Sequence, residues 1–181
     1  SGLADFTVTG LIANLQASTL DGDLNVTTGT VAGLSIDTGN GANTINASAL
    51  TDNQVLTLTG NDAASVTLNA GDLSAPTFDG VLTVTVTGGA TSTNTITTGN
   101  NSASIAGADD NDAIAVVAGA TDDDNTLTLS GLADFTVTGL IANLQASTLD
   151  GDLDVTTGTV AGLSIATGNG ANTINAEALT N

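Results

Sequence analysis

The residues best suited to chemistry in this chain are aspartates, which gather in short clusters. The clusters are Asp109, Asp110 and Asp112; Asp122, Asp123 and Asp124; and Asp21 and Asp23, with their later counterparts Asp150, Asp152 and the added Asp154. Carboxylates held this close raise one another's pKa unless a cation lies among them. Calcium takes about six to eight oxygen ligands from carboxylates, carbonyls and Asn side chains. We therefore predict calcium sites at these clusters.

The overall charge favours the same interpretation. The chain has 181 residues, of which 19 are acidic and none is Lys, Arg or His, so its formal net charge is −19. No internal cation can offset the self-repulsion of the compact state, which leaves a bound metal ion as the counter-charge. The alternative is that each cluster is a solvated acidic loop that keeps the protein soluble.

Composition also excludes several classes of function. Binding to nucleic acids or anionic membranes depends largely on Lys and Arg, so we predict neither a nucleic-acid partner nor membrane insertion. Nucleophile–base catalysis usually needs His, Cys or Lys, and the chain contains none. The repeated pair Asp21 and Asp23 could hydrolyse a glycoside in principle, but aromatic sugar platforms are almost absent. We predict that the protein is not an enzyme.

The chain contains a long internal repeat. Residues 1–52, the first copy, recur as residues 130–181, the second copy, with 48 of 52 positions identical. The four differing pairs are Asn25/Asp154, Asp37/Ala166, Ser48/Glu177 and Asp52/Asn181. We therefore expect residues 1–129 to form one full repeat and residues 130–181 to begin the next, without a linker, as part of a longer tandem array.

Short β-type runs fill each repeat and indicate an all-β fold. The runs alternate apolar residues with Thr or Ser and are separated by Gly, Asn and Asp. Such spacing fits either a parallel β-solenoid (a β-roll or β-helix) or tandem β-sandwich domains. Short strands, three Phe without Trp or Tyr, and the lack of a Pro-marked linker favour the solenoid. The pattern leaves open two or three strands per coil, and Leu11 to Leu20 could form a short helical turn.

The segment from Thr38 to Asn46, repeated as 167–175, resembles the glycine-rich nonapeptide of repeats-in-toxin proteins. Gly39 and Gly41 match its glycines, Ile45 matches its large apolar residue, and Asn43 stands where that family has Asp. A degraded relative contains Asp62. The resemblance implies a calcium β-roll, in which turn carbonyls and the Asp carboxylate bind the metal. It adds Asn43 and Asp62 to the predicted ligands.

These features predict a secreted bacterial protein, located outside the cell or on its surface. We expect a calcium-stabilised structural segment of a surface filament, an S-layer-like coat, a biofilm matrix or a giant adhesin. Metal binding would couple to folding, and the segments would associate head to tail or through tandem repeats. The alternative is an adhesive module or stalk that grips cell-surface carbohydrate or another surface. Ice binding is not expected, because the Thr-rich runs are irregularly spaced in the sequence.

Overall fold

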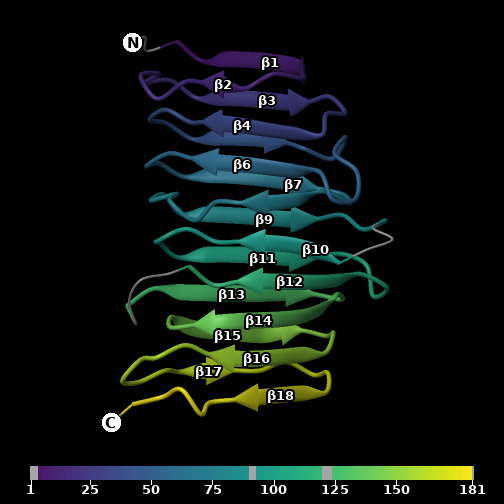
Figure 1. The fold of residues 1–181 in the computed structure, drawn as a ribbon, viewed down its shortest axis with the longest axis vertical. Coiled ribbons are helices and arrows are strands. Elements are labelled where there is room, and N and C mark those ends of the chain that lie inside the picture. Colours follow the sequence, from purple (N-terminus) through teal and green to yellow (C-terminus); the bar gives the residue numbers. More distant parts are fainter. Residues whose placement is uncertain (1–3, 90–92, 120–123, 181) are drawn as a thin grey trace.

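The protein is a parallel β-solenoid with two strands in each coil (Figure 1). The computed structural model describes residues 4–89, 93–119 and 124–180. Strands alternate between two sheets along the chain, so each coil adds one strand to each sheet. The coils stack in chain order, and β1 and β18 lie at opposite ends of the stack (Figure 1).

Each sheet contains nine strands in the described part of the chain. The first sheet consists of β1 (Phe6–Leu11), β3 (Leu24–Thr28), β5 (Asn43–Asn46), β7 (Ala64–Leu68), β9 (Leu82–Val86), β11 (Ala103–Gly107), β13 (Thr126–Gly131), β15 (Asn143–Leu149) and β17 (Ile165–Ala166). The second consists of β2 (Leu15–Gln16), β4 (Gly33–Asp37), β6 (Val55–Thr59), β8 (Asp72–Ser74), β10 (Asn94–Thr97), β12 (Ala113–Val117), β14 (Asp134–Leu140), β16 (Leu153–Thr157) and β18 (Asn172–Asn175).

This architecture confirms the predicted all-β parallel solenoid and decides the number of strands per coil. The tandem β-sandwich alternative is wrong, because the strand pairs are parallel and each strand pairs with the strand two places along the chain. The helical turn considered for Leu11 to Leu20 is also wrong. That segment contains strand β2, and its second copy forms the longer strand β15.

The core is a narrow column of aliphatic side chains between the two sheets. Within a typical strand such as β9, residues alternate between buried and outward-facing positions. Fully burying a Val, Leu or Ile contributes about 1.5–3 kcal/mol each, and the coils between the two end coils supply several. Phe78 and Phe135 are the largest buried side chains. No helix in the described residues is long and apolar enough to span a bilayer.

The turns absorb differences in coil length. Leu127 stacks on Leu144, whereas Asn43 stacks on Ala64, and the second of these coils uses a longer stretch of chain. The strands nevertheless stay paired, because the extra residues lie in the turns at the two edges. The pairing also continues across the start of the second copy, where β12 pairs with β14 and β13 pairs with β15.

The two copies of the repeat lie on opposite sheets. Strands β1, β3 and β5 of the first copy belong to the first sheet, whereas their counterparts β14, β16 and β18 belong to the second. The reason is that each counterpart comes an odd number of places later in the order of strands, as β14 comes thirteen places after β1. The structural unit is therefore half a coil, one strand with its turn, and either sheet accepts the same sequence.

Candidate functional site in the turns and on the outer faces

One file of aspartates links successive coils through the backbone. The carboxylate of Asp5 accepts a hydrogen bond from the backbone N–H of Asp23 at 2.9 Å, and Asp23 accepts one from Ala42 at 2.9 Å. In the second copy, Asp134 accepts from the N–H of Asp152 at 2.8 Å. Hydrogen bonds to an ionised acceptor are stronger than neutral ones. Two predicted ligands, Asp23 and Asp152, thus take part in coil-to-coil bonds.

A second set of aspartates pairs with Asn side chains of the next coil. The carboxylate of Asp21 accepts from the amide of Asn40 at 2.8 Å, and Asp79 accepts from Asn100 at 2.7 Å. Asp150 accepts from an Asn amide one coil away at 2.7 Å. Sequence reasoning missed Asp79, because it belongs to no cluster. A search for an Asp and an Asn one coil apart would have found it. Such a search needs the number of residues per coil, which the sequence did not reveal.

The buried amide of Asn43 holds together the Gly-rich turn that resembles the toxin nonapeptide. Its nitrogen Nδ2 donates to the carbonyls of Gly39 at 3.4 Å, Gly41 at 3.0 Å and Ala63 at 3.2 Å. The side chain is 2% exposed. Asn94 repeats this arrangement with two carbonyls, at 2.9 and 3.3 Å. The predicted role of Asn43 used its oxygen as a ligand, whereas this geometry uses its nitrogen as a donor to turn carbonyls.

The turn from Asp109 to Asp112 is the most compact acidic cluster in the described residues. Asn111 donates from its backbone N–H and its side-chain amide to Asp109, at 3.1 and 3.0 Å. Its amide also donates to Asp110 at 2.8 Å. The backbone bond from Asn111, then its side-chain bond, holds the pKa of Asp109 below its ordinary value. This cluster is therefore tied together locally by one asparagine.

Asp109 and Asp112 also converge on a glycine from the preceding coil. A Cβ built on Gly88 would meet Asp109 Oδ2 at 3.0 Å and Asp112 Oδ2 at 3.2 Å. Gly88 has a φ of +94°, and Asp112 is buried. Sequence reasoning did not find Gly88, because it lies a whole coil before Asp109 in the chain.

The remaining predicted ligands lie apart from one another. Asp62, Asp124 and Asp154 are exposed, and Asp154 faces outward from strand β16. Asp122 and Asp123 fall outside the described residues. Within residues 4–89, 93–119 and 124–180, no three acidic side chains gather around a point where a metal ion could be held. The calcium sites therefore stay a prediction.

Carboxylates that already accept an N–H bond could still take part in metal binding. An ionised carboxylate has about four lone-pair sites, so one hydrogen bond leaves capacity for a cation. Among the predicted ligands, Asp109 and Asp112 place one carboxylate oxygen each within 3.2 Å of a common point, the position of a Cβ on Gly88. Carboxylate oxygens are ligands that calcium accepts, so we keep this pair as the candidate for calcium. The three-carbonyl turn around Asn43 fits a cation less well, because the amide nitrogen already contacts those carbonyls.

The outer face of the first sheet carries two ordered columns of small uncharged side chains, which we call the hydroxyl face. One column contains Thr7, Asn25, Thr44, Ser65, Thr83, Ser104 and Thr128; the other contains Thr9, Thr27, Asn46, Thr67, Thr85, Ala106 and Ser130. Neighbours in a column are about 4.8 Å apart, and the columns are about 6.6 Å apart. The irregular spacing of the Thr-rich runs in the sequence, on which our expectation of no ice binding rests, does not prevent the strand register from aligning these side chains. The expectation itself stays a prediction.

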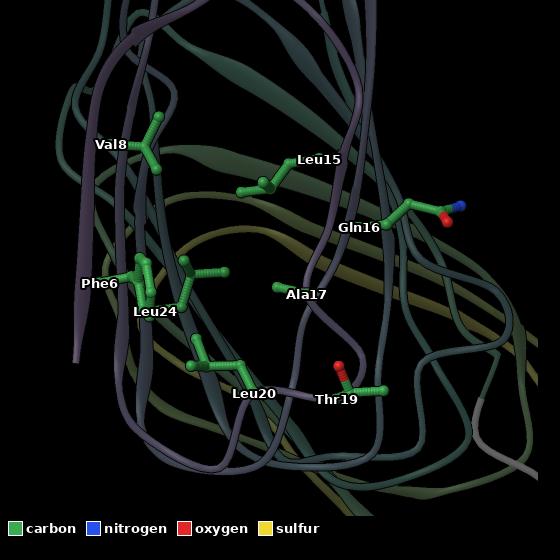
Figure 2. Close-up of a pocket in the computed structure, with 8 residues that line it drawn as sticks. All are labelled: Phe6, Val8, Leu15, Gln16, Ala17, Thr19, Leu20 and Leu24. Atoms are coloured by element: carbon green, nitrogen blue, oxygen red, sulfur yellow. The ribbon is translucent and has the colours of Figure 1, made fainter. Parts of the chain in front are cut away.

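A hollow of about 360 Å³ lies at the end coil formed by β1 and β2, and we call it the end hollow. Figure 2 shows Leu15 and Ala17 pointing across the interior toward Phe6, Val8 and Leu24, with Gln16 pointing away. None of the described residues that line it is acidic. Acid–base catalysis needs a titratable group within reach of the substrate, and this lining supplies none.

The structure therefore offers three features from which a function can be argued: the coil-to-coil bonds of the turns, the hydroxyl face and the end hollow. Comparisons of the chain with protein-family models, with curated proteins and with solved structures found no match.

Proposed function

We propose that this chain is a structural segment of an extracellular bacterial filament, coat or biofilm matrix. The observation that carries the proposal is the continuous strand ladder: β12 pairs with β14 and β13 with β15, so stacking passes into the second copy without a break. A solenoid that stacks through its repeat boundaries makes a stiff rod whose length depends on the number of repeats.

The use of the polar side chains supports a structural role. Asp23, Asp21 and Asn43 each bond to a neighbouring coil. The Asn43 amide donates its bonds from a buried position, whereas Asp21 and Asp23 accept theirs at exposed positions, and all of these bonds help to fix the register of the coils. The apolar lining of the end hollow, whose described residues include no titratable group, also supports a role other than catalysis.

We further propose that calcium stabilises the coils and couples their folding to export. The charge of −19 has no internal counter-charge, so the compact chain repels itself where calcium is scarce. Asp109 and Asp112 would hold the ion, which would supply positive charge between their carboxylates. Outside the cell, the free energy of metal binding would then add to that of folding.

Circular dichroism and small-angle scattering, with calcium and then with a chelator, test both parts of this proposal. We expect a β-sheet spectrum and a rod-like profile in millimolar calcium, and partial loss of both in chelator. A β-folded rod that is indifferent to chelator would contradict the calcium role and leave the structural role in place. A compact globular profile in calcium would contradict the structural role.

The hydroxyl face supports a second candidate, an adhesive module that binds a neutral carbohydrate surface. In a chain of charge −19, the aligned positions of this face carry no charge. Co-sedimentation with insoluble polysaccharides tests this candidate, with Thr44→Asp and Thr83→Asp as variants that place charge on the face. Binding that these variants weaken would favour the adhesive module, whereas equal or absent binding would contradict it. Retention of the protein in growing ice would instead overturn our expectation that it does not bind ice.

A further inference from the structure

Nearly identical segments meet different surroundings in the two copies of the repeat. Phe6 is 55% exposed in the first copy, whereas its counterpart Phe135 is 1% exposed. Val8 is half-buried, and its counterpart Val137 is fully buried. Because the local sequences are the same, the difference comes from the neighbours alone. The second copy therefore shows the environment that this sequence prefers.

In the second copy, the cover is the coil formed by β12 and β13. Ile114 and Val116 of β12 pair with Phe135 and Val137 of β14. Leu127 of β13 pairs with Leu144 of β15. In the first copy, the equivalent position is the space next to the end hollow at β1 and β2, where no coil precedes them in the described structure.

The cover also determines how much of the sequence becomes a strand. In the first copy only Leu15–Gln16 forms a strand, β2. In the second copy the same stretch lies within the much longer strand β15, Asn143–Leu149. Parallel strands are stabilised by pairing on both sides, so the uncovered end coil is an incomplete version of the covered one.

We infer that the end coil of β1 and β2 is a docking surface for a coil with the sequence of β12 and β13, supplied by another copy of the repeat. The incoming β12 pairs with β1 and places counterparts of Ile114 and Val116 against Phe6 and Val8. The incoming β13 pairs with β2 over Leu15. This inference rests on the proposed structural function and deepens it, because it names the partner of the filament's end.

The opposite end has a different partner, which makes the docking specific. The exposed strand β18 is the counterpart of β5, and β5 is covered by β7. Ile45 of β5 is fully buried, whereas Ile174 of β18 is 42% exposed. The end at β18 therefore fits a coil with the sequence of β6 and β7, and the end at β1 fits one with the sequence of β12 and β13.

A tryptophan reporter in an extended chain tests the inference. The chain has no Trp, so Phe6→Trp gives a single signal. Residues 101–129 are fused ahead of Ser1 of the whole chain, which recreates the sequence found before Ser130. We expect the tryptophan emission to shift to shorter wavelength and acrylamide quenching to fall severalfold relative to the unextended variant. The values should approach those of a Phe135→Trp reporter.

Two controls decide the outcome. An extension of identical length and composition in shuffled order should leave the reporter exposed; equal protection by both extensions would overturn the inference. Amide hydrogen exchange of residues 6–16, in the extended chain without any substitution, gives the same readout if the tryptophan variant does not fold. Unchanged exchange there would also overturn the inference. Protection of the end coil in an extended chain whose scattering profile is globular would support the docking inference and contradict the proposed structural function.

Discussion

At the scale of single residues, the turns are held together by side chains that act as donors and acceptors between coils. Asn43 donates to three carbonyls, and Asp23 accepts a backbone N–H of the next coil. The sequence pattern predicted both residues as calcium ligands, and that role stays a prediction. The pattern could not show that the Asn amide nitrogen contacts the carbonyls expected to bind a metal, because that depends on the carbonyl of Ala63, one coil away.

We predict that Asn43→Leu destabilises the protein, although Leu is common at inward positions of the neighbouring strands. The substitution leaves turn carbonyls without a donor, at a cost of about 1–3 kcal/mol for a buried group. Thermal or urea unfolding should show a lower midpoint. The matched control is Asn172→Leu in the exposed last coil, where water can replace the amide and the loss should be much smaller. Equal losses at the two positions would contradict this account.

The pKa of Asp109 makes part of the stability depend on pH. Its folded-state pKa lies below the ordinary value of 3.8, because Asn111 donates two hydrogen bonds to the carboxylate. A depressed pKa contributes stability that is present above the ordinary pKa and is lost as the pH falls through the folded-state value. NMR titration should show that Asn111→Ala raises the Asp109 pKa. Asn61→Ala, in an exposed turn, should leave it unchanged, and a shift caused by both variants would argue against the local cause.

At the scale of elements, the sequence predicted strands and turns better than it predicted how they stack. Alternation of apolar residues with Thr identifies strands such as β6 and β9, because inward and outward positions alternate in a half-buried strand. Coil length was not predictable, since the chain from Asn43 to its partner Ala64 is longer than the chain from Leu127 to Leu144. The hydroxyl face and the Asp79–Asn100 pair depend on that stacking, so both emerge only from the structure.

Close approach between stacked strands requires a glycine at the end of β13. Gly131 has a φ of +102°, and a Cβ there would collide with the carbonyl oxygen of Gly107 in β11. We predict that Gly131→Ala lowers the unfolding midpoint, with a cost of about 1–3 kcal/mol from the strained backbone. Gly33→Ala is the control, because a Cβ there has no neighbour within 4 Å. Similar midpoints for the two variants would count against the predicted strain.

At the scale of the whole molecule, the charge of −19 is balanced by no cationic side chain, so solvent ions set the cost of compaction. Carboxylates more than about 10 Å apart are largely screened from one another at about 0.1 M salt. Screening by salt weakens the repulsion between all carboxylates alike. A bound calcium ion reduces the repulsion only between the carboxylates that hold it. The two effects can therefore be separated by comparing salts.

We predict that the thermal midpoint rises with sodium chloride and rises further in calcium chloride at the same ionic strength. Differential scanning calorimetry measures both effects. Magnesium chloride at matched ionic strength is the control, because magnesium demands a stricter octahedral geometry. Identical midpoints in calcium and magnesium would indicate general screening and would exclude a specific calcium site. A midpoint that does not change with sodium chloride would contradict the repulsion argument.

The odd number of strands per repeat has a consequence for anything displayed on the surface. Because β14 lies on the sheet opposite β1, each successive repeat in an array of this period is turned by half a revolution about the long axis. Any patch carried by a repeat therefore alternates between the two sides of the rod and returns to the same side only every second repeat. The rod proposed above would therefore present such a patch on both flanks, and it would be able to bridge two surfaces or to cross-link with neighbours on both sides.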